Sequence, residues 1–201
     1  MRVKNFRIFV VLIVIGAILI GCTTSVSRMR PKRKTDLSGR WNDTDARLVA
    51  ETMIRGMLSS NWIRKYRLSE GQKPVIIVGE IENLTSEHIE TGTFLKDIER
   101  ELVNSGKVSF VASAGEREGI RDERQDQQSN ASRRTRAELL EETGADVMLI
   151  GGLKSHLDTE GRRQVRFYQV DLELIEIETN EKLWIDTHKI KKYVQKALIK
   201  P

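Results

Sequence analysis

Three apolar runs along the chain predict buried strands. Residues 74–81 form a nearly continuous apolar run rich in β-branched side chains, which is typical of a strand buried on both faces. Residues 107–112 repeat this pattern in shorter form, and residues 146–153 repeat it at the same length. We expect Gly151 and Gly152 to end this last strand. Together the three runs predict the centre of a sheet.

Residues 91–105 show the spacing of an amphipathic helix between the first two strands. Gly106 follows it and suits a left-handed C-cap. The side chains expected to face the core are Phe94, Leu95, Ile98, Leu102 and Val103. This helix would connect the two strands in a β-α-β order.

An N-terminal helical segment is expected over residues 36–66. Asp43 or Thr44 can cap its helix, after which apolar and small side chains recur at helical spacing, at Leu48, Val49, Thr52, Met53 and Met57. Trp41 precedes this helix and Trp62 follows it. We expect both indoles to anchor the helix onto the domain; the alternative is an exposed aromatic side chain that contacts a partner.

Residues 114–136 are highly charged and poor in apolar side chains. Opposite charges three and four positions apart support an exposed helix, and a mobile loop is the alternative. Residues 137–143 predict a further short helix, closed at Gly144. These two segments would connect the second and third strands.

The C-terminal part predicts a hairpin with strands over residues 164–177 and 182–190 and a turn at 179–181. The apolar positions of the first strand change parity twice, which predicts bulges or burial on both faces. The successive sets are Val165 and Phe167, then Val170, Leu172 and Leu174, then Ile175 and Ile177. The order β-α-β-α-α-β-β-β predicts an α/β (α+β) fold, with a single small mixed sheet, a C-terminal antiparallel hairpin and helices packed on the sheet.

The first 22 residues have the pattern of a bacterial lipoprotein signal. Basic side chains precede the uninterrupted apolar run 8–20, and Leu19, Ile20 and Gly21 then lead to Cys22, the only cysteine of the chain. The thiol after the cut can carry a diacylglycerol. The alternative is an uncleaved membrane helix, but a run of this length rises only about 20 Å, less than the roughly 30 Å hydrocarbon core.

These patterns divide the chain into four expected parts. They are a signal peptide (1–21), a basic flexible tether (22–35), one α/β domain (36–192) and a basic C-terminal tail (193–201). A lone cysteine cannot form an intramolecular disulfide. The domain must therefore be stabilised by a packed core, which a domain of this size can build.

The net charge of +5 comes from the N-terminal region. Residues 1–34 hold eight of the 34 basic side chains and no acidic one, so residues 35–201 carry 26 basic against 29 acidic side chains. This balance disfavours nucleic-acid binding, which needs a basic face on the folded domain. A basic run beside the anchor suits an anionic membrane or envelope surface, or it is a solvated linker; its residues are Arg28, Arg30, Lys32, Arg33 and Lys34.

No motif indicates an enzyme. The chain lacks Ser-x-x-Lys, Gly-x-Ser-x-Gly, a Walker phosphate-binding loop and Gly-x-Gly-x-x-Gly. His88, His156 and His188 lie on separate elements without the spacing of a metal site, and His88 is more typical of a hydrogen-bonded loop residue than of a catalytic base. We therefore expect a binding or regulatory role without a catalytic site, metal or cofactor.

Three stretches resemble the LpoB family, lipoprotein activators of class A penicillin-binding proteins. They are Asp36-Leu-Ser-Gly-Arg-Trp-Asn-Asp-Thr-Asp45 with Arg47-Leu-Val-Ala-Glu51, then Gly79-Glu-Ile-Glu-Asn-Leu-Thr-Ser-Glu-His-Ile-Glu-Thr91, and Gly144-Ala-Asp-Val-Met-Leu-Ile-Gly151. The third is the least specific, because it recurs in TolB-like and curli-secretion lipoprotein folds. The resemblance covers about residues 36–191.

The resemblance implies an outer-membrane lipoprotein, anchored by a lipid on Cys22, whose domain faces the periplasm. It would bind the periplasmic docking domain of a class A penicillin-binding protein and stimulate its glycosyltransferase and transpeptidase steps allosterically. Four residues match the family pattern, and they either contact the partner or fix their loop by hydrogen bonds: Asn83, Thr85, His88 and Thr91.

The tether from Cys22 to Asp36 has 14 residue steps, so it spans at most about 50 Å when extended. The alternative function is a structural or secretion-associated envelope lipoprotein of the curli-secretion type, which would assemble into a ring.

Overall fold

A computed structural model describes residues 25–196, and the chain divides into two compact units, Met1–Arg33 and Lys34–Pro201. In the first unit, the Arg33 N–H donates to the Arg30 carbonyl at 2.9 Å and closes a turn. The expected signal peptide with its Cys22 lies outside the described residues, as do residues 197–201. Within residues 25–196, no helix has the length and apolar character needed to cross a membrane.

In the second unit, two helices precede the first strand. One helix connects the first strand to the second, and another connects the second strand to the third. In chain order the elements are α2 (Asp43–Ser59), α3 (Asn61–Glu70), β1 (Val75–Asn83), α4 (Thr91–Ser105), β2 (Ser109–Phe110), α5 (Ala114–Asn130), β3 (Val147–Glu160), β4 (Arg163–Glu176) and β5 (Lys182–Gln195). The helical segment expected over residues 36–66 therefore consists of two helices.

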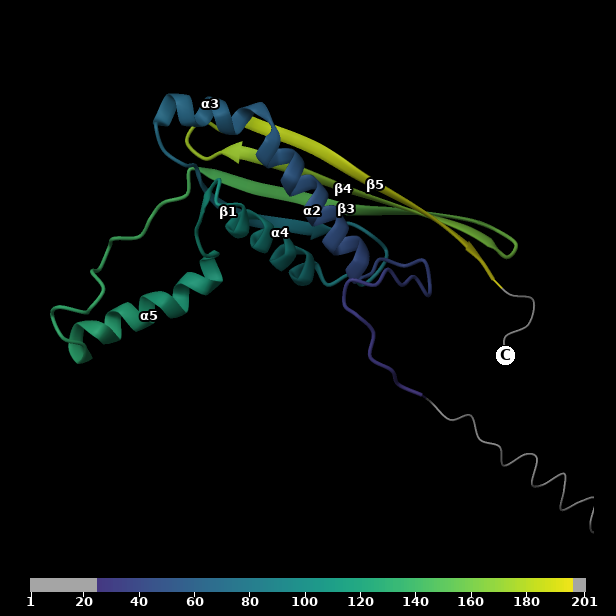
Figure 1. Ribbon diagram of the computed structural model, residues 1–201, viewed down its shortest axis with the longest axis horizontal. Coiled ribbons are helices and arrows are strands. Elements are labelled where there is room, and N and C mark those ends of the chain that lie inside the picture. Colours follow the sequence, from purple (N-terminus) through teal and green to yellow (C-terminus); the bar gives the residue numbers. More distant parts are fainter. Residues whose placement is uncertain (1–24, 197–201) are drawn as a thin grey trace, which may run out of the picture. The chain divides into compact units, whose positions relative to one another are not determined.

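The strands form one mixed sheet in the order β2-β1-β3-β4-β5. β1 runs parallel to β2 and β3, whereas β3, β4 and β5 pair antiparallel. Figure 1 shows these three long strands running together to one end of the sheet. The predicted single mixed sheet with a C-terminal antiparallel hairpin is confirmed.

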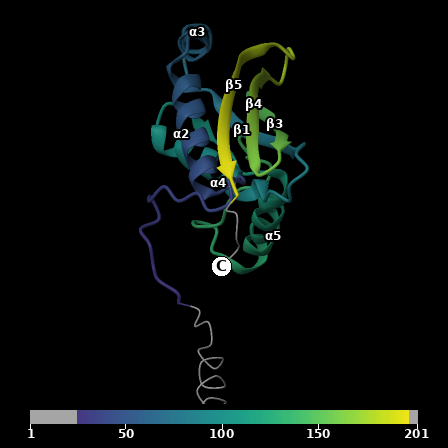
Figure 2. The same ribbon diagram turned by 90° about the vertical axis from the view of Figure 1, so that its right-hand side faces the viewer.

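The core lies between one face of the sheet and two helices. α2 and α4 pack against each other, with α2 over β5 and α4 over β1 (Figures 1 and 2). Because side chains alternate along a strand, β4 buries every second residue, and the helices bury a stripe each. These core residues include Tyr168, Val170, Leu172 and Leu174 of β4, Val49, Met53 and Met57 of α2, and Phe94, Ile98 and Leu102 of α4.

The opposite face of the sheet, called the open face below, carries partly exposed side chains. Every β4 side chain on that face remains at least partly accessible to solvent. Val165 and Phe167 belong to this set, so the first expected change of parity is not a bulge. The second change does coincide with a register shift opposite β5, between Leu174 and Ile175.

Asn42 caps α2 in place of the expected Asp43 or Thr44. Its side chain accepts hydrogen bonds from Thr44 N and Asp45 N at 3.0 and 3.2 Å, and Asp45 Oδ2 accepts from Asn42 N at 3.0 Å. This reciprocal arrangement satisfies backbone donors that the helix itself leaves free. A reciprocal cap requires a carboxylate three residues after the capping residue, and Asp45 supplies it for Asn42. The helix therefore begins one residue before the start that a cap at Asp43 would give.

Trp62 anchors the helical segment as predicted. Its ring is 5% exposed, and its Nε1 donates to the Met57 carbonyl at 2.8 Å. Val103, by contrast, is 55% exposed although helical spacing placed it toward the core. Gly106 does end α4 in the left-handed conformation, with φ of +62°.

The expectation that Gly151 and Gly152 end a strand is wrong. β3 continues through both glycines and pairs with β4 without a break in register. At Gly151, the carbonyl oxygen of Asp171 and the Leu172 side chain occupy the place that a Cβ would take. The glycine therefore allows two strands to pair at a crowded point instead of ending one of them.

Residues 137–143 form a turn at 139–140 and are otherwise irregular, so the expectation of a short helix there is wrong. Leu140 is 98% exposed with φ of +65°, and a short helix without burial is not stable alone. Instead, the side chains of Gln127 and Gln128 on α5 bond the N–H and the carbonyl of Ala137, both at 2.8 Å. These contacts hold the returning chain against α5.

The two outer strands differ in length from the prediction. β2 has only the residues Ser109 and Phe110, whereas residues 107–112 were expected. β5 extends to Gln195, so residues 193–195 of the expected tail belong to the sheet. Each added residue gains a partner on β4, which explains the longer strand.

α5 is the exposed helix expected from its charges, and it buries none of its side chains. Ser113 caps it, since its hydroxyl oxygen accepts from the Glu116 N–H at 3.4 Å and its own N–H donates to Glu116 Oε2 at 2.9 Å. Lys96 of α4 lies 2.6 Å from Glu116 Oε1. This ion pair connects the start of α5 to the packed part of the domain.

The pKa of Glu116 tests that contact. The hydrogen bond from Lys96, followed by those from Ser113, lowers its pKa from 4.5 to about 2. Its contribution to stability is therefore complete above pH 4.5 and is lost as the pH falls through about 2. We expect its carboxyl NMR signal to titrate near pH 2, and at a higher pH in Lys96→Met with Ser113→Ala, which removes the ammonium and hydroxyl donors but keeps the backbone donor at position 113. Equal midpoints in the two proteins would contradict the contact.

Candidate functional site

The four residues that the sequence singled out lie in the loop between β1 and α4 and at its two ends. Asn83 Oδ1 accepts hydrogen bonds from Thr85 N at 3.1 Å and from Thr85 Oγ1 at 2.7 Å, and its Nδ2 donates to the Glu87 carbonyl at 2.9 Å. Thr85 Oγ1 accepts from Glu87 N at 3.1 Å. Asn83 and Thr85 therefore fix the loop in one shape, and that shape presents Glu87.

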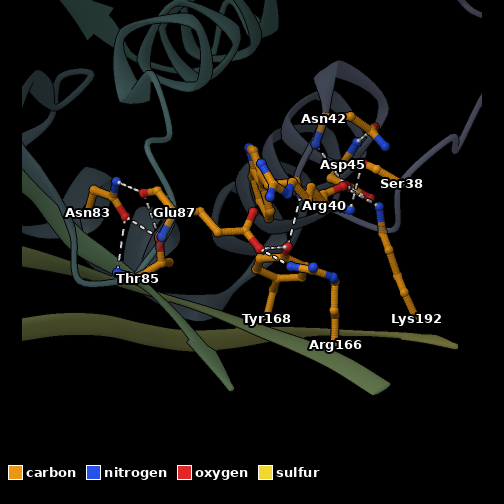
Figure 3. A network of polar contacts seen from close by, with 11 residues as sticks. Ser38, Arg40, Asn42, Asp45, Asn83, Thr85, Glu87, Arg166, Tyr168 and Lys192 are labelled. Carbon is orange, nitrogen blue, oxygen red and sulfur yellow. Dashed lines mark hydrogen bonds and ion pairs between the residues drawn. The ribbon is translucent and has the colours of Figure 1, made fainter. Parts of the chain in front are cut away.

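The Glu87 side chain points from this loop toward β4 (Figure 3). Its Oε1 accepts hydrogen bonds from Arg166 Nη1 and from the Tyr168 hydroxyl, the latter at 2.8 Å. The Glu87 and Arg166 side chains are each 15% exposed. The Tyr168 oxygen in turn accepts from Trp41 N at 3.0 Å. The Tyr168 hydroxyl thus connects Trp41, in the segment before α2, to Glu87 in the loop.

Tyr168 can act in this way because it keeps its proton. Burial, together with the hydrogen bond to Glu87, raises the pKa of Tyr168 to about 12. The phenol therefore remains a donor to Glu87 at physiological pH. Trp41 packs edge-on against Tyr168 and Phe94, with ring centroids 5.7 and 6.1 Å apart, so its predicted anchoring contact is confirmed.

Lys192 of β5 makes a second contact with the segment that leads into α2. Its Nζ lies 2.6 Å from Asp45 Oδ2 and 2.8 Å from Asp36 Oδ2, and it donates to the Arg40 carbonyl at 3.1 Å. The Lys192 side chain is 10% exposed. We call the two attachments the clasp, formed by Asp36, Trp41, Asp45, Glu87, Arg166, Tyr168 and Lys192. Figure 3 labels five of these residues, Asp45, Glu87, Arg166, Tyr168 and Lys192.

An open hollow of about 330 Å³ lies between the clasp and the loop. His88 is exposed at this hollow, and Thr91 is the half-buried first residue of α4. The Glu87 carboxylate accepts hydrogen bonds from Arg166 and Tyr168 at the edge of this hollow. Its lining combines Trp41 and Ile89 with polar side chains that include Asn42 and Glu90.

The open face carries a second candidate surface, set by the strand register. Side chains of β3, β4 and β5 form rows across the sheet. One row is His156, Phe167 and Lys191; the next is Lys154, Gln169 and Lys189; the third includes Asp171 and Thr187. Basic side chains and a partly exposed aromatic ring therefore gather toward one end of the open face.

Acidic side chains follow toward the middle of the same face. Asp171 accepts from Lys154 at 3.1 Å, and Glu173 accepts from Lys182 at 2.6 Å. Burial by itself raises the pKa of Asp171, but hydrogen bonds from Thr187, Gln169 and Lys154 outweigh it and lower the pKa below its ordinary value. On the same face Asp158 of β3 lies beyond the basic rows, across from Val165, so basic and acidic side chains are interspersed along the open face.

The sequence indicated the loop and the anchoring role of Trp41, but not the polar contacts of the clasp. Tyr168 and Lys192 meet their carboxylate partners across 81 and 147 positions, and no local pattern reveals contacts of that separation. Partner contact by Asn83, Thr85, His88 and Thr91 stays a prediction. Among the residues that the structure describes, no group of three or more His, Cys, Asp or Glu could hold a metal ion.

Comparisons with known proteins bear on the family. The sequence profile of the peptidoglycan-synthase activator LpoB matches residues 45–190. The LpoB C-terminal domain from Escherichia coli is similar in structure, with 15% identity and a TM-score of 0.46, over 74% of this chain and 99% of that chain. The NMR structure of E. coli LpoB shows 14% identity and a TM-score of 0.41, over 89% and 84%.

A further similar structure is the lipoprotein GNA1162 from Neisseria meningitidis, with 16% identity and a TM-score of 0.37, over 60% of this chain and 83% of that chain. No curated protein sequence matches the chain significantly. At such identities the structural likenesses concern the fold alone. The sequence profile spans more than half of the chain and confirms the predicted resemblance. The chain therefore belongs to the LpoB family of peptidoglycan-synthase activators.

Proposed function

We propose that this chain is a lipid-anchored periplasmic regulator that binds a class A penicillin-binding protein and activates it allosterically. The observation that carries the proposal is the LpoB-family match over residues 45–190. Activation requires only that the regulator bind one conformation of the synthase more tightly than another and so shift its population. The chemistry of cell-wall synthesis then takes place on the partner.

The geometry of the domain supports a docking role. The clasp and the bonds of Asn83 and Thr85 hold the loop and the start of α2 in place before any partner arrives. A surface that is already ordered loses less conformational freedom on binding.

The N-terminal sequence supports attachment to the outer membrane through a lipid on Cys22, with the domain in the periplasm. The tether then places Asp36 within about 50 Å of the membrane. The partner's docking domain must reach into that range. The basic residues beside the anchor, Arg28, Arg30, Lys32, Arg33 and Lys34, would favour an anionic surface there.

Cys22→Ser is expected to abolish lipidation, because serine has no thiol for the thioether. Cells fed labelled palmitate should label the wild-type protein and not the variant, and the variant should leave the outer-membrane fraction. Ser25→Ala, three residues away, serves as the control and should behave as wild type. Equal labelling of the Cys22→Ser protein would show that the lipid lies elsewhere.

The partner is tested by affinity capture. The full chain, immobilised in detergent micelles, is exposed to solubilised envelopes of its own organism, and bound proteins are identified by mass spectrometry. The proposal predicts recovery of a bifunctional synthase with glycosyltransferase and transpeptidase domains. Recovery of only the protein itself, or of secretion components, would contradict it and favour the envelope-assembly alternative.

A further inference from the structure

β5 is the outer strand of the sheet, and the direction of its backbone groups can be assigned. The sheet order ends at β5, and successive residues of a strand point their N–H and C=O groups to opposite sides. The Lys196 N–H, directly after β5, donates to Arg162 at 2.9 Å. Even-numbered residues of this stretch therefore face β4, and odd-numbered residues face outward.

Thr187 agrees with this assignment. Its N–H donates to the side chain of its neighbour Asp186 at 2.8 Å instead of to β4. Within residues 187–193 of β5, the outward-facing backbone groups consequently belong to Thr187, Lys189, Lys191 and Tyr193. Within the described residues no other strand pairs with this edge.

The same odd-numbered residues direct their side chains to the open face. Lys189 and Lys191 lie across from Gln169 and Phe167 of β4, on the face opposite the core. Both lysines are exposed, and Tyr193 is 60% exposed. Outward backbone groups and accessible side chains are therefore combined in one short stretch of chain.

The unpaired charges along this edge are positive. Lys154, Lys182 and Lys192 are paired with carboxylates. Among the described residues, Lys189 and Lys191 have no such partner within ion-pair distance. A strand that added to β5 would bring its own side chains beside these two ammonium groups, so carboxylates there would complete the pairs.

We propose that β5 is the docking site for an extended, acidic segment of a protein partner, which adds to the sheet along residues 187–193. Its backbone pairs with the outward-facing groups, and carboxylates at alternate positions lie across from Lys189 and Lys191. An apolar side chain of the segment lies beside Tyr193. For the identity of the partner this rests on the proposed function, which makes it a synthase.

Charge argues against a second copy of the chain as the occupant. Two β5 strands paired edge to edge would bring lysines next to lysines, and like charges across strands are destabilising. Lysine on an edge strand is a common means of preventing such self-pairing. Lys189 and Lys191 therefore disfavour pairing with a second copy of the chain and favour pairing with an acidic strand.

The test compares two charge-reversal variants of the full chain in detergent micelles. Lys189→Glu with Lys191→Glu reverses both candidate contacts. Lys65→Glu with Lys73→Glu makes the same change at exposed positions on and after α3 and is the matched control. Circular dichroism and thermal melting check that both variants fold. Affinity for the synthase should fall by at least about tenfold in the first variant and remain unchanged in the control.

Hydrogen exchange supplies a second readout that does not depend on the variants. On binding, the outward-facing amides of Lys189, Lys191 and Tyr193 should gain protection. A synthetic peptide with glutamate at alternate positions and threonine between them is the independent probe, and the peptide with lysine in place of glutamate is its control. The glutamate peptide should protect these amides, and the lysine peptide should not.

The outcomes separate this inference from the proposed function. If the wild type binds the synthase and the Lys189/Lys191 variant binds equally well, the docking site lies elsewhere and the activator function stands. If no synthase binds the wild type, the proposed function fails, and the glutamate peptide alone decides the inference. Protection of these amides by self-association, or no protection by the peptide, would overturn it.

Discussion

Replacing Gly151 with alanine is expected to lower the free energy of unfolding by about 3 kcal/mol or more. A Cβ there would fall onto the backbone carbonyl of Asp171 and within 2.6 Å of Leu172 Cδ2. A backbone oxygen held between two paired strands cannot turn aside as a flexible side chain can. The strands must separate instead, within the longest pairing in the sheet.

Denaturant unfolding of the Gly151→Ala protein measures this effect. Gly144→Ala is the matched control, because nothing lies within 4 Å of its added methyl group. The control should unfold within about 0.5 kcal/mol of the wild type. Equal stability of the two variants would show that β3 does not pass Asp171 as closely as described.

Trp41→Ala is the second large change, with an expected loss of about 3 kcal/mol. It removes the edge-on contacts with Phe94 and Tyr168 and leaves a space beside the clasp. For a domain of this size the melting temperature should fall by about 6 to 12 °C. The backbone hydrogen bond from Trp41 N to Tyr168 does not require the indole and remains possible.

Trp41→Phe separates the two interpretations of this residue. As an anchor, the phenyl ring should recover much of the lost stability, because it can still pack on Phe94. Differential scanning calorimetry and synthase binding are measured on both variants. Unchanged melting of Trp41→Ala together with lost synthase binding would move Trp41 from the core to the interface.

The parts of the fold that local patterns specify were predictable. The apolar run of β1, the helical stripe of α4 and its left-handed Gly106 each depend on residues within a few positions of one another. Gly151 was misread, because a glycine that ends a strand and one that admits a neighbouring strand look alike in sequence. Leu140 was misread for a related reason: helical spacing is present, but no surface is available to bury it.

The candidate site shows the same division. Asn83 and Thr85 bond within their own loop, so their family pattern could be recognised and their hydrogen-bonding role anticipated as one alternative. Glu87 and Lys192 act through partners far along the chain, which only the pairing of β4 and β5 brings close. Charge on the open face likewise emerges from the strand register and not from the order of residues.

The most direct test of the activator function is the rate of glycan polymerisation by a purified class A penicillin-binding protein of the same organism. The rate is measured with lipid II substrate across a titration of the full chain in detergent. The proposed function predicts a rate that rises with added protein and saturates, as expected when binding shifts the synthase toward its active conformation. A rate that stays unchanged at saturating protein would contradict it.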